Sequence, residues 1–278
     1  MSSQSTPRPT PAGSESTRRT VEVLGQRLAV AVRRGDGTRT PLLLMNGIGA
    51  NLELLQPLVD ALDPAIEVIR FDVPGVGGSP TPPFPLRFPA LAWLVGRMLD
   101  ALGYQRVDVF GISWGGALAQ QFALQHPRRC RRLILVSTST GAIMVPGRLE
   151  VLAKLATPRR YRDQEYMASI AADIYGGDID PALARIFADK MRPGDSRGYL
   201  YQMLGGAGWT SVPWLRCLRQ PTLIVAGDDD RLVPVVNARI MHQLIPRSRL
   251  HIFHGGHLGL VLQAAELAPV IGAFLPTP

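Results

Sequence analysis

The stretch Val107–Gly115, with the sequence VDVFGISWG, decides the fold class. Its first four residues are an apolar strand pattern, and a helical pattern runs from Trp114 to His126. The motif G-x-S-x-G lies at the junction between them. On its own that motif is weak, because Gly and Ser are common, but a change from strand to helix is the context that it requires. The pattern therefore predicts that Ser113 is a nucleophile held at a sharp turn.

Close packing of strand and helix explains the two glycines of the motif. A chain that reverses from strand to helix within a few residues holds the residue between them in a strained conformation. Gly111 and Gly115 lack a Cβ atom, so the neighbouring strand and helix can approach without a clash. The start of the helix carries free N–H groups and a partial positive charge, which suit a developing oxyanion.

Outward from this turn, short apolar runs alternate with helical patterns along most of the chain. The expected strands are residues 42–45, 67–71, 107–110, 133–136, 222–225 and 250–253. The expected helices are residues 52–62, 88–102, 114–126 and 262–274. We expect residues 20–34 to form two short antiparallel strands at the edge of the sheet. Together with the serine turn, this rhythm predicts an α/β-hydrolase fold, with a mostly parallel central sheet and helices on both faces.

The rhythm is broken over residues 141–217, where helical patterns occur without a core strand. We expect this segment to be a helical cap, or lid, over the active site. The core then comprises residues 21–140 and 218–278, and the polar residues 1–20 form a disordered tail. The aromatic side chains of the cap either line an apolar docking face or form the cap's own small core: Tyr161, Tyr166, Tyr175, Tyr199, Tyr201, Trp209 and Trp214.

A nucleophilic serine needs a general base, and in this fold the chain order is serine, acid, histidine. The run HGGH at residues 254–257 follows the last strand, and its glycines favour His257 as the base, with His254 as the alternative. The acid is expected within AGDDDRLVP at residues 226–234. Three adjacent carboxylates cannot all be buried as charges. One of them should turn inward, and the G-x-x-D spacing favours Asp230.

Two backbone N–H groups should form the oxyanion hole. One belongs to Trp114, the residue after the nucleophile, and the other to the loop NGIGAN at residues 46–51, where Ile48 is the expected donor. A second glycine-rich loop, DVPGVGGS at residues 72–79, lacks G-x-G-x-x-G and the lysine of a phosphate-binding loop. We expect it to be a structural turn.

The composition indicates a folded protein that neither spans a membrane nor binds nucleic acid. Hydrophobic residues make up 46% of the 278 residues and charged residues 19%, which excludes a disordered chain. No apolar stretch approaches the ~20 residues that span a bilayer, and the N-terminus lacks the apolar core of a secretory signal. The net charge is +8, but the bases are scattered and no nucleic-acid motif accompanies them. Cys130 and Cys217 are expected to be reduced thiols, and no ligand cluster predicts a metal or cofactor.

Over about residues 20–275, the chain resembles the intracellular medium-chain-length polyhydroxyalkanoate (PHA) depolymerases. The segments that carry the resemblance are NGIGANLELLQPLVDALDP, FDVPGVGGS, GISWGGALAQQFA, IYGG at 174–177, GWTS at 208–211 and AGDDDRLVP. Asn46 stands where ordinary esterases commonly have His. The chain departs from the family pattern in its tail, near residues 178–180 and in GGHLGL at 255–260.

The resemblance implies that Ser113, Asp230 and His257 form a catalytic triad. It also implies a cytoplasmic enzyme on or near polyester storage granules that releases 3-hydroxyacyl units. The expected reaction is acyl transfer, in which Ser113 attacks an ester carbonyl, His257 accepts its proton, and water hydrolyses the acyl-enzyme.

Other classes of protein with this fold remain to be weighed. A hydrolase of soluble medium-chain acyl esters or of carbon–carbon bonds would use the same residues on a small-molecule substrate. A haloalkane dehalogenase needs Asp at position 113 and a polymer synthase needs Cys, so the serine argues against both. Outside enzymes, the alternative is a granule-coating binding protein. An intact nucleophile, acid and base argue against it.

Overall fold

The computed structural model describes residues 16–156, 164–177 and 196–275. Within these ranges one eight-stranded sheet has the order β1-β2-β4-β3-β5-β6-β7-β8. The strands from β3 to β8 run parallel, whereas β1 and β2 are antiparallel and lie at one edge, as expected. The strand bounds are β1 Ser16–Val23, β2 Gln26–Arg33, β3 Leu42–Met45, β4 Val68–Phe71, β5 Val107–Ile112, β6 Cys130–Val136, β7 Thr222–Gly227 and β8 Ser248–Phe253.

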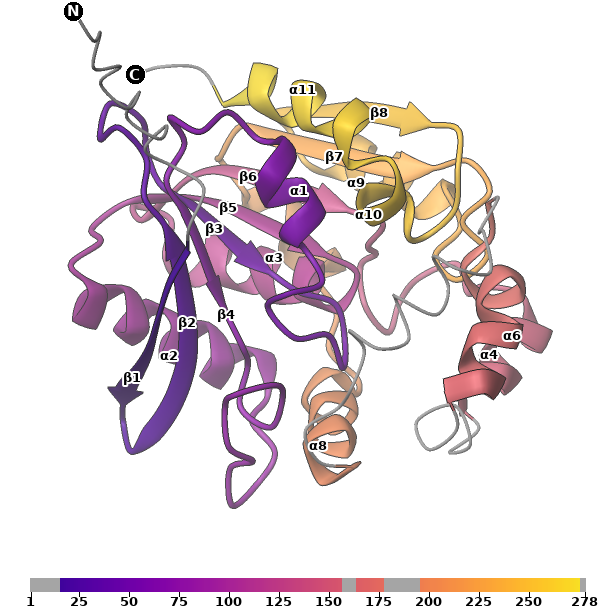
Figure 1. The fold of residues 1–278 in the computed structure, drawn as a ribbon. Helices are drawn as coiled ribbons and strands as arrows, with labels where there is room; N and C mark the ends of the chain where they lie inside the picture. The colour runs from indigo at the N-terminus through magenta and orange to yellow at the C-terminus, as the bar shows by residue number, and fades with distance from the viewer. Residues whose placement is uncertain (1–15, 157–163, 178–195, 276–278) are drawn as a thin grey trace, which may run out of the picture.

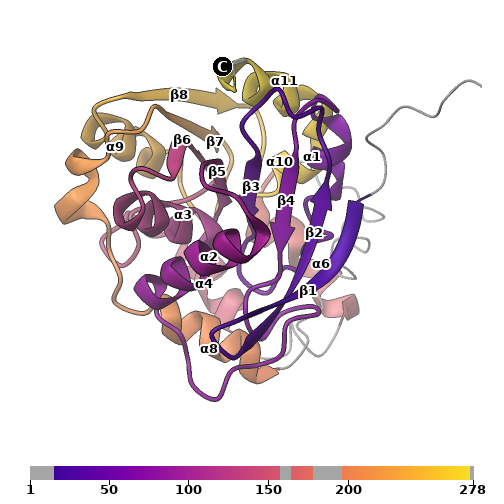
Figure 2. The same ribbon diagram turned by 90° about the vertical axis from the view of Figure 1, so that its left-hand side faces the viewer.

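Helices cover both faces of the sheet (Figures 1 and 2). In β3, Leu43 and Met45 belong to one core and Leu42 and Leu44 to the other, because successive side chains point to opposite faces. The first core is closed by α2 (Phe88–Leu102), α3 (Trp114–Gln125) and α9 (Val236–Leu244). The second is closed by α1 (Gln56–Ala61), α10 (Gly259–Leu262) and α11 (Ala264–Phe274). The predicted fold class is confirmed.

Several expected boundaries differ from the structure, and three of them have a clear physical cause. Strand β1 begins at Ser16, inside the expected tail, because pairing with β2 uses the backbone and leaves its polar side chains 17–20 exposed at the edge. Helix α1 begins at Gln56 rather than at residue 52, with a proline in its first turn, a position where proline is favoured. The last helix is split at Gln263, which has φ −117° and ψ 34°.

The described part of residues 141–217, here called the insertion, lies between β6 and β7 at the carboxyl ends of the parallel strands (Figure 1). It contains α4 (Leu149–Ala156), α6 (Gln164–Tyr175), α8 (Ser196–Gly206) and the 3-10 helix η1 (Val212–Cys217). An isolated bridge between Gly141 and Thr210 joins the two ends of the insertion. The insertion therefore leaves and rejoins the sheet at adjacent points.

The two tryptophans of the insertion are not at a docking face. Trp209 is 8% exposed and packs on Phe88 with ring centroids 5.0 Å apart. Its indole Nε1 donates to Gln121 Oε1 on α3 at 2.7 Å. Trp214 packs on Trp209 and against the same core. Both tryptophans anchor the end of the insertion to the core of the sheet domain. Tyr161 lies outside the described residues.

Candidate active site

Ser113 forms a strained turn between β5 and α3. Its backbone has φ 54° and ψ −120°, a region that non-glycine residues rarely occupy. A Cβ atom on Gly111 would lie 2.3 Å from Gly115 O, and one on Gly115 would lie 2.3 Å from Asn46 O. The steric reason expected for both glycines is confirmed. The Ser113 carbonyl accepts the Thr138 hydroxyl at 2.7 Å and the Gly116 N–H at 2.9 Å, which fixes the turn.

His257 and Asp230 form a buried hydrogen-bonded pair. His257 Nδ1 lies 2.7 Å from Asp230 Oδ2, and the two side chains are 5% and 0% exposed. The second carboxylate oxygen, Oδ1, accepts the N–H groups of Leu232 at 3.0 Å and Val233 at 2.8 Å. These backbone bonds fix the carboxylate, and the carboxylate fixes the imidazole ring. Asp230 follows β7 and His257 follows β8, so both lie at the carboxyl ends of the parallel strands, where β5 also ends.

The other two carboxylates of the 228–230 run have different partners. Asp228 accepts His254 Nδ1 and the Gly255 N–H, each at 3.0 Å, and the bond from His254 lowers the pKa of Asp228. The His254 side chain is 93% exposed. Asp229 accepts the Gly177 N–H at 2.8 Å. The geometry thus favours His257 over His254 as the base and leaves Asp230 as the inward carboxylate.

The segment Ile174–Gly177 of the insertion lies directly on the histidine loop. The His257 N–H donates to Tyr175 O at 2.6 Å, and the Tyr175 ring stacks on the imidazole with centroids 5.9 Å apart. A Cβ atom on Gly256 would lie 2.2 Å from Gly176 O. Sequence reasoning missed these contacts. The two consecutive glycines after Tyr175 were the available signal, because both have positive φ.

The loop at residues 46–51 lies beside the nucleophile. A Cβ atom on Gly47 would be 3.7 Å from Ser113 Cβ. Asn46 Nδ2 donates to Asn51 O across the loop. Trp114 is the first residue of α3, and its N–H is one of the groups that a helix leaves unpaired at its start. Ile48 lies in this loop and Trp114 at the helix start, so both expected donors belong to segments that adjoin Ser113.

Ser113 Oγ makes no hydrogen bond with His257 in the described ranges. In unliganded sites this contact is often long and tightens only when substrate binds. The structure thus pairs Asp230 with His257 and places the 46–51 loop beside Ser113.

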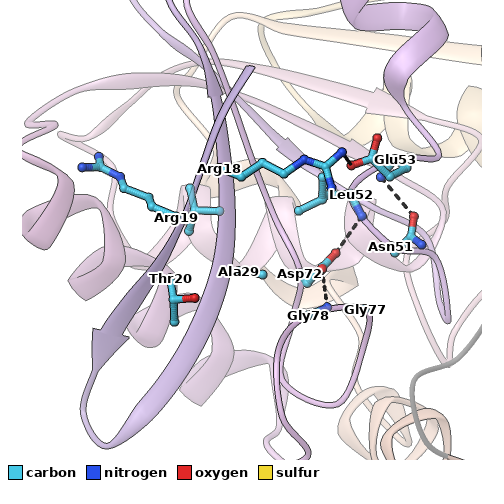
Figure 3. Close-up of a pocket in the computed structure, with 11 residues that line it drawn as sticks. Arg18, Arg19, Thr20, Ala29, Asn51, Leu52, Glu53, Asp72, Gly77 and Gly78 are labelled. Atoms are coloured by element: carbon cyan, nitrogen blue, oxygen red, sulfur yellow. Dashed lines mark hydrogen bonds and ion pairs between the residues drawn. The ribbon is translucent and has the colours of Figure 1, made fainter. Parts of the chain in front are cut away.

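A cavity of about 440 Å³ is lined by residues of β1 and β2 and by the segments 51–53 and 72–78 (Figure 3). Arg18 forms an ion pair with Glu53 at its rim. Asp72 accepts the N–H groups of Leu52 at 2.7 Å and Gly78 at 2.8 Å. Burial raises the pKa of Asp72, although these bonds act in the opposite direction. The 72–79 loop is thus a turn organised by a buried carboxylate.

Two negative findings apply to the residues that the structure describes. They contain no group of three or more His, Cys, Asp or Glu side chains placed to hold a metal ion. None of their helices combines the length and the hydropathy needed to cross a bilayer.

Comparison with known proteins adds four findings. Residues 40–264 match the alpha/beta hydrolase fold family. The chain is 54% identical over 259 residues to a poly(3-hydroxyalkanoate) depolymerase of Ectopseudomonas oleovorans, with 92% of each chain covered. It is 28% identical to a 2-hydroxy-6-oxo-2,4-heptadienoate hydrolase of Pseudomonas putida, with 86% of this chain and 90% of the relative covered. A crystal structure of a hydrolase from Pseudomonas aeruginosa PA01 superposes with a TM-score of 0.78 at 25% identity, over 93% of this chain and 98% of that one.

Proposed function

The chain belongs to the α/β-hydrolase family, and we propose that it depolymerises poly(3-hydroxyalkanoate) through an acyl-enzyme on Ser113. It is an ester hydrolase, and its similarity to the Ectopseudomonas enzyme extends through the insertion as well as the core. One observation carries the mechanism. The strained Ser113 lies at the carboxyl ends of the parallel strands, where the buried pair of His257 and Asp230 also lies.

Each residue has a defined role in the proposed reaction. Ser113 Oγ attacks the ester carbonyl carbon, and its proton passes to His257 Nε2. Asp230 stabilises the imidazolium through Nδ1, which lies 2.7 Å away. The N–H groups of Ile48 and Trp114 bind the oxyanion. His257 then protonates the leaving alkoxide of the polymer chain, and the acyl group remains on Ser113.

Deacylation repeats these steps with water. His257 removes a proton from the water, the resulting hydroxide attacks the acyl carbon, and Ser113 leaves with the proton returned to it. The products are one carboxylic acid end and one hydroxyl end for each ester cleaved. For this polymer they are 3-hydroxyalkanoic acids or short oligomers, with medium-length side chains as the preferred substrate class.

The proposal extends to where the enzyme works and how it reaches its substrate. The polymer is water-insoluble, so the enzyme acts at the surface of cytoplasmic storage granules. The insertion, residues 141–217, caps the site and sets the side-chain preference, and the core comprises residues 21–140 and 218–278. The support for the cap is the direct contact of Tyr175 with His257.

The test compares two substrates with four proteins. Wild type, Ser113→Ala and His257→Ala are assayed for clearance of amorphous medium-chain PHA granules and for hydrolysis of soluble p-nitrophenyl octanoate. His254→Ala is the matched control, because it removes an exposed imidazole from the same loop. Clearance by wild type and His254→Ala alone supports the proposal. Ester hydrolysis without clearance would replace the polymer by soluble medium-chain esters, and binding to granules without any hydrolysis would leave a granule-coating protein.

A further inference from the structure

One side chain of α8 reaches the proposed oxyanion hole from the insertion. Gln202 Oε1 accepts the Gly49 N–H at 2.7 Å, a contact between residues 153 positions apart. The Gln202 backbone carbonyl accepts the indole N–H of Trp114 at 3.1 Å. Gly49 follows Ile48 directly, and Trp114 is the other expected donor. A single residue therefore contacts both halves of the proposed oxyanion hole, and it is 4% exposed.

Helix α8 is seated on the core by glycines that share a face with Gln202. A Cβ atom on Gly198 would lie 2.0 Å from Gly75 O, and one on Gly205 would lie 2.5 Å from Leu86 O. Residues three and four positions apart lie on one face of a helix. The backbones meet on both sides of Gln202, so its side chain has a defined position over the 46–51 loop.

The 46–51 loop needs such an outside contact. Gly47 and Gly49 flank Ile48, and Gly49 has φ 72°. Glycine populates many backbone conformations, so this loop depends on hydrogen bonds to keep one conformation. The two bonds within the loop, from Asn46 Nδ2 to Asn51 O and from the Ala50 N–H to Gly47 O, do not involve the Gly49 N–H. The bond to Gln202 holds the N–H of the peptide between Ile48 and Gly49. Fixing that peptide plane restricts rotation of Ile48, whose own N–H is the expected oxyanion donor.

The amide group of Gln202 is only half satisfied. Its Nε2 donor is buried and has no hydrogen-bond partner among the described residues. A buried donor without a partner lowers stability, so an apolar side chain of the same size would serve packing better. The contact made by Oε1 is what explains an amide at this position.

We propose that Gln202 is a positioning residue that holds the Ile48–Gly49 peptide in the oxyanion-binding conformation, so that the insertion sets the efficiency of acyl transfer as well as covering the site. This role rests on the proposed function, because it requires Ser113 to be the nucleophile and Ile48 to donate to the oxyanion.

The main test replaces Gln202 by methionine, which has a similar size and no amide acceptor. We expect kcat for p-nitrophenyl octanoate to fall by about 10- to 100-fold, less than the ~10²- to 10³-fold typical when an oxyanion donor is removed outright. KM should change by less than about threefold, because ground-state binding is not affected. Gln121→Met is the matched control. Gln121 is also buried and also accepts an N–H at 2.7 Å, but from Trp209, so its loss should lower stability and leave kcat unchanged.

A second readout separates positioning from packing. Octyl trifluoromethyl ketone forms a charged tetrahedral adduct with a serine, whereas octyl methyl ketone binds only as a ground-state analogue. Gln202→Met should reduce the preference for the trifluoromethyl compound by about the same factor as kcat, since both report oxyanion binding. In wild type, amide exchange should show a protected Gly49 N–H beside a fast-exchanging Ile48 N–H, a measurement that needs no variant.

The outcomes distinguish this inference from the proposed function. Wild-type activity in Ser113→Ala would remove the proposed function itself. If Ser113→Ala is inactive but Gln202→Met keeps the wild-type kcat and ketone preference, only the role of Gln202 is overturned. Rapid exchange of the Gly49 N–H in wild type would overturn it as well.

Discussion

Replacing Asp230 by asparagine should abolish most of the activity while leaving the protein folded. The carboxylate divides its contacts between two oxygens: Oδ1 accepts the N–H groups of Leu232 and Val233, and Oδ2 faces His257 Nδ1. The asparagine oxygen can retain both backbone contacts. Its NH₂ group then faces Nδ1, which must accept a hydrogen bond instead of donating one. The proton of the neutral ring therefore moves to Nε2, and His257 can no longer accept the proton of Ser113.

The expected loss follows from this change of tautomer. The same exchange in a serine protease lowers kcat by about 10⁴-fold, which is about 5.5 kcal/mol of transition-state stabilisation at ~1.36 kcal/mol per factor of ten. The number of hydrogen bonds at residue 230 stays the same, so the free energy of unfolding should change by no more than about 1 kcal/mol.

The assay is steady-state hydrolysis of p-nitrophenyl octanoate at one fixed pH for all variants, with urea unfolding of the same samples. Asp228→Asn is the matched control. It changes the charge equally but touches the exposed His254, and its kcat should stay within about twofold of wild type. If Asp230→Asn kept more than about a tenth of the wild-type kcat, or if Asp228→Asn lost more than Asp230→Asn, the assignment of the acid would be refuted.

Three further predictions follow from contacts elsewhere. Gly256→Ala places a Cβ atom 2.2 Å from Gly176 O, a backbone atom that cannot move aside as a side chain can. The substitution should therefore displace the histidine loop, lower kcat and reduce the free energy of unfolding by about 1–3 kcal/mol. Arg131→Ala removes the two bonds to Asp108, whose side chain is 1% exposed, and should cost about 3–5 kcal/mol in urea unfolding because a buried charge is left unpaired. His254→Ala should keep kcat within about twofold, because the ring is 93% exposed.

Controls for these variants come from similar residues in open surroundings. A Cβ atom on Gly272 meets no atom within 4 Å, so Gly272→Ala should be neutral or stabilising. If Gly272→Ala lost as much stability as Gly256→Ala, the steric explanation for Gly256 would be wrong. Arg97→Ala breaks an ion pair whose arginine is 53% exposed and should cost no more than about 1 kcal/mol. An Arg131 variant as stable as the Arg97 variant would contradict the buried-charge argument. If His254→Ala lowered kcat more than about tenfold, His254 would have to be considered again as the general base.

Local patterns were enough to predict the fold. Helix α2 has the expected bounds because proline lies in its first turn and Gly103 ends it with φ 82°. The apolar run of β5 is recognisable because both faces of a parallel strand are buried. The tail boundary was wrong because an edge strand such as β1 needs only backbone partners, and its exposed Arg18 and Arg19 resemble those of a flexible segment.

The candidate site could be predicted only in part, and its residue roles remain predictions until the variants are measured. Ser113, Asp230 and His257 each lie in a short motif just after a strand, which is a local signal. Gln202 has no such signal, and Tyr175 has only the two glycines that follow it. Their contacts join positions far apart in the sequence, and the polarity or size of either residue is compatible with an ordinary helix. Trp209 was expected at a docking face or in the cap's own core, but it lies in the core of the sheet. Its aromatic character does not reveal which core it enters.

The glycine contacts between insertion and core have a consequence for protein engineering. At Gly176 against Asp229 and at Gly198 against Gly75, main chain meets main chain with no room for a Cβ atom. Transplanting the insertion from a relative would therefore require both surfaces to be exchanged together. Libraries aimed at altered substrate preference are better directed at the outward side chains of α8, where Leu200, Met203 and Leu204 are 44–49% exposed and can vary without separating the two backbones.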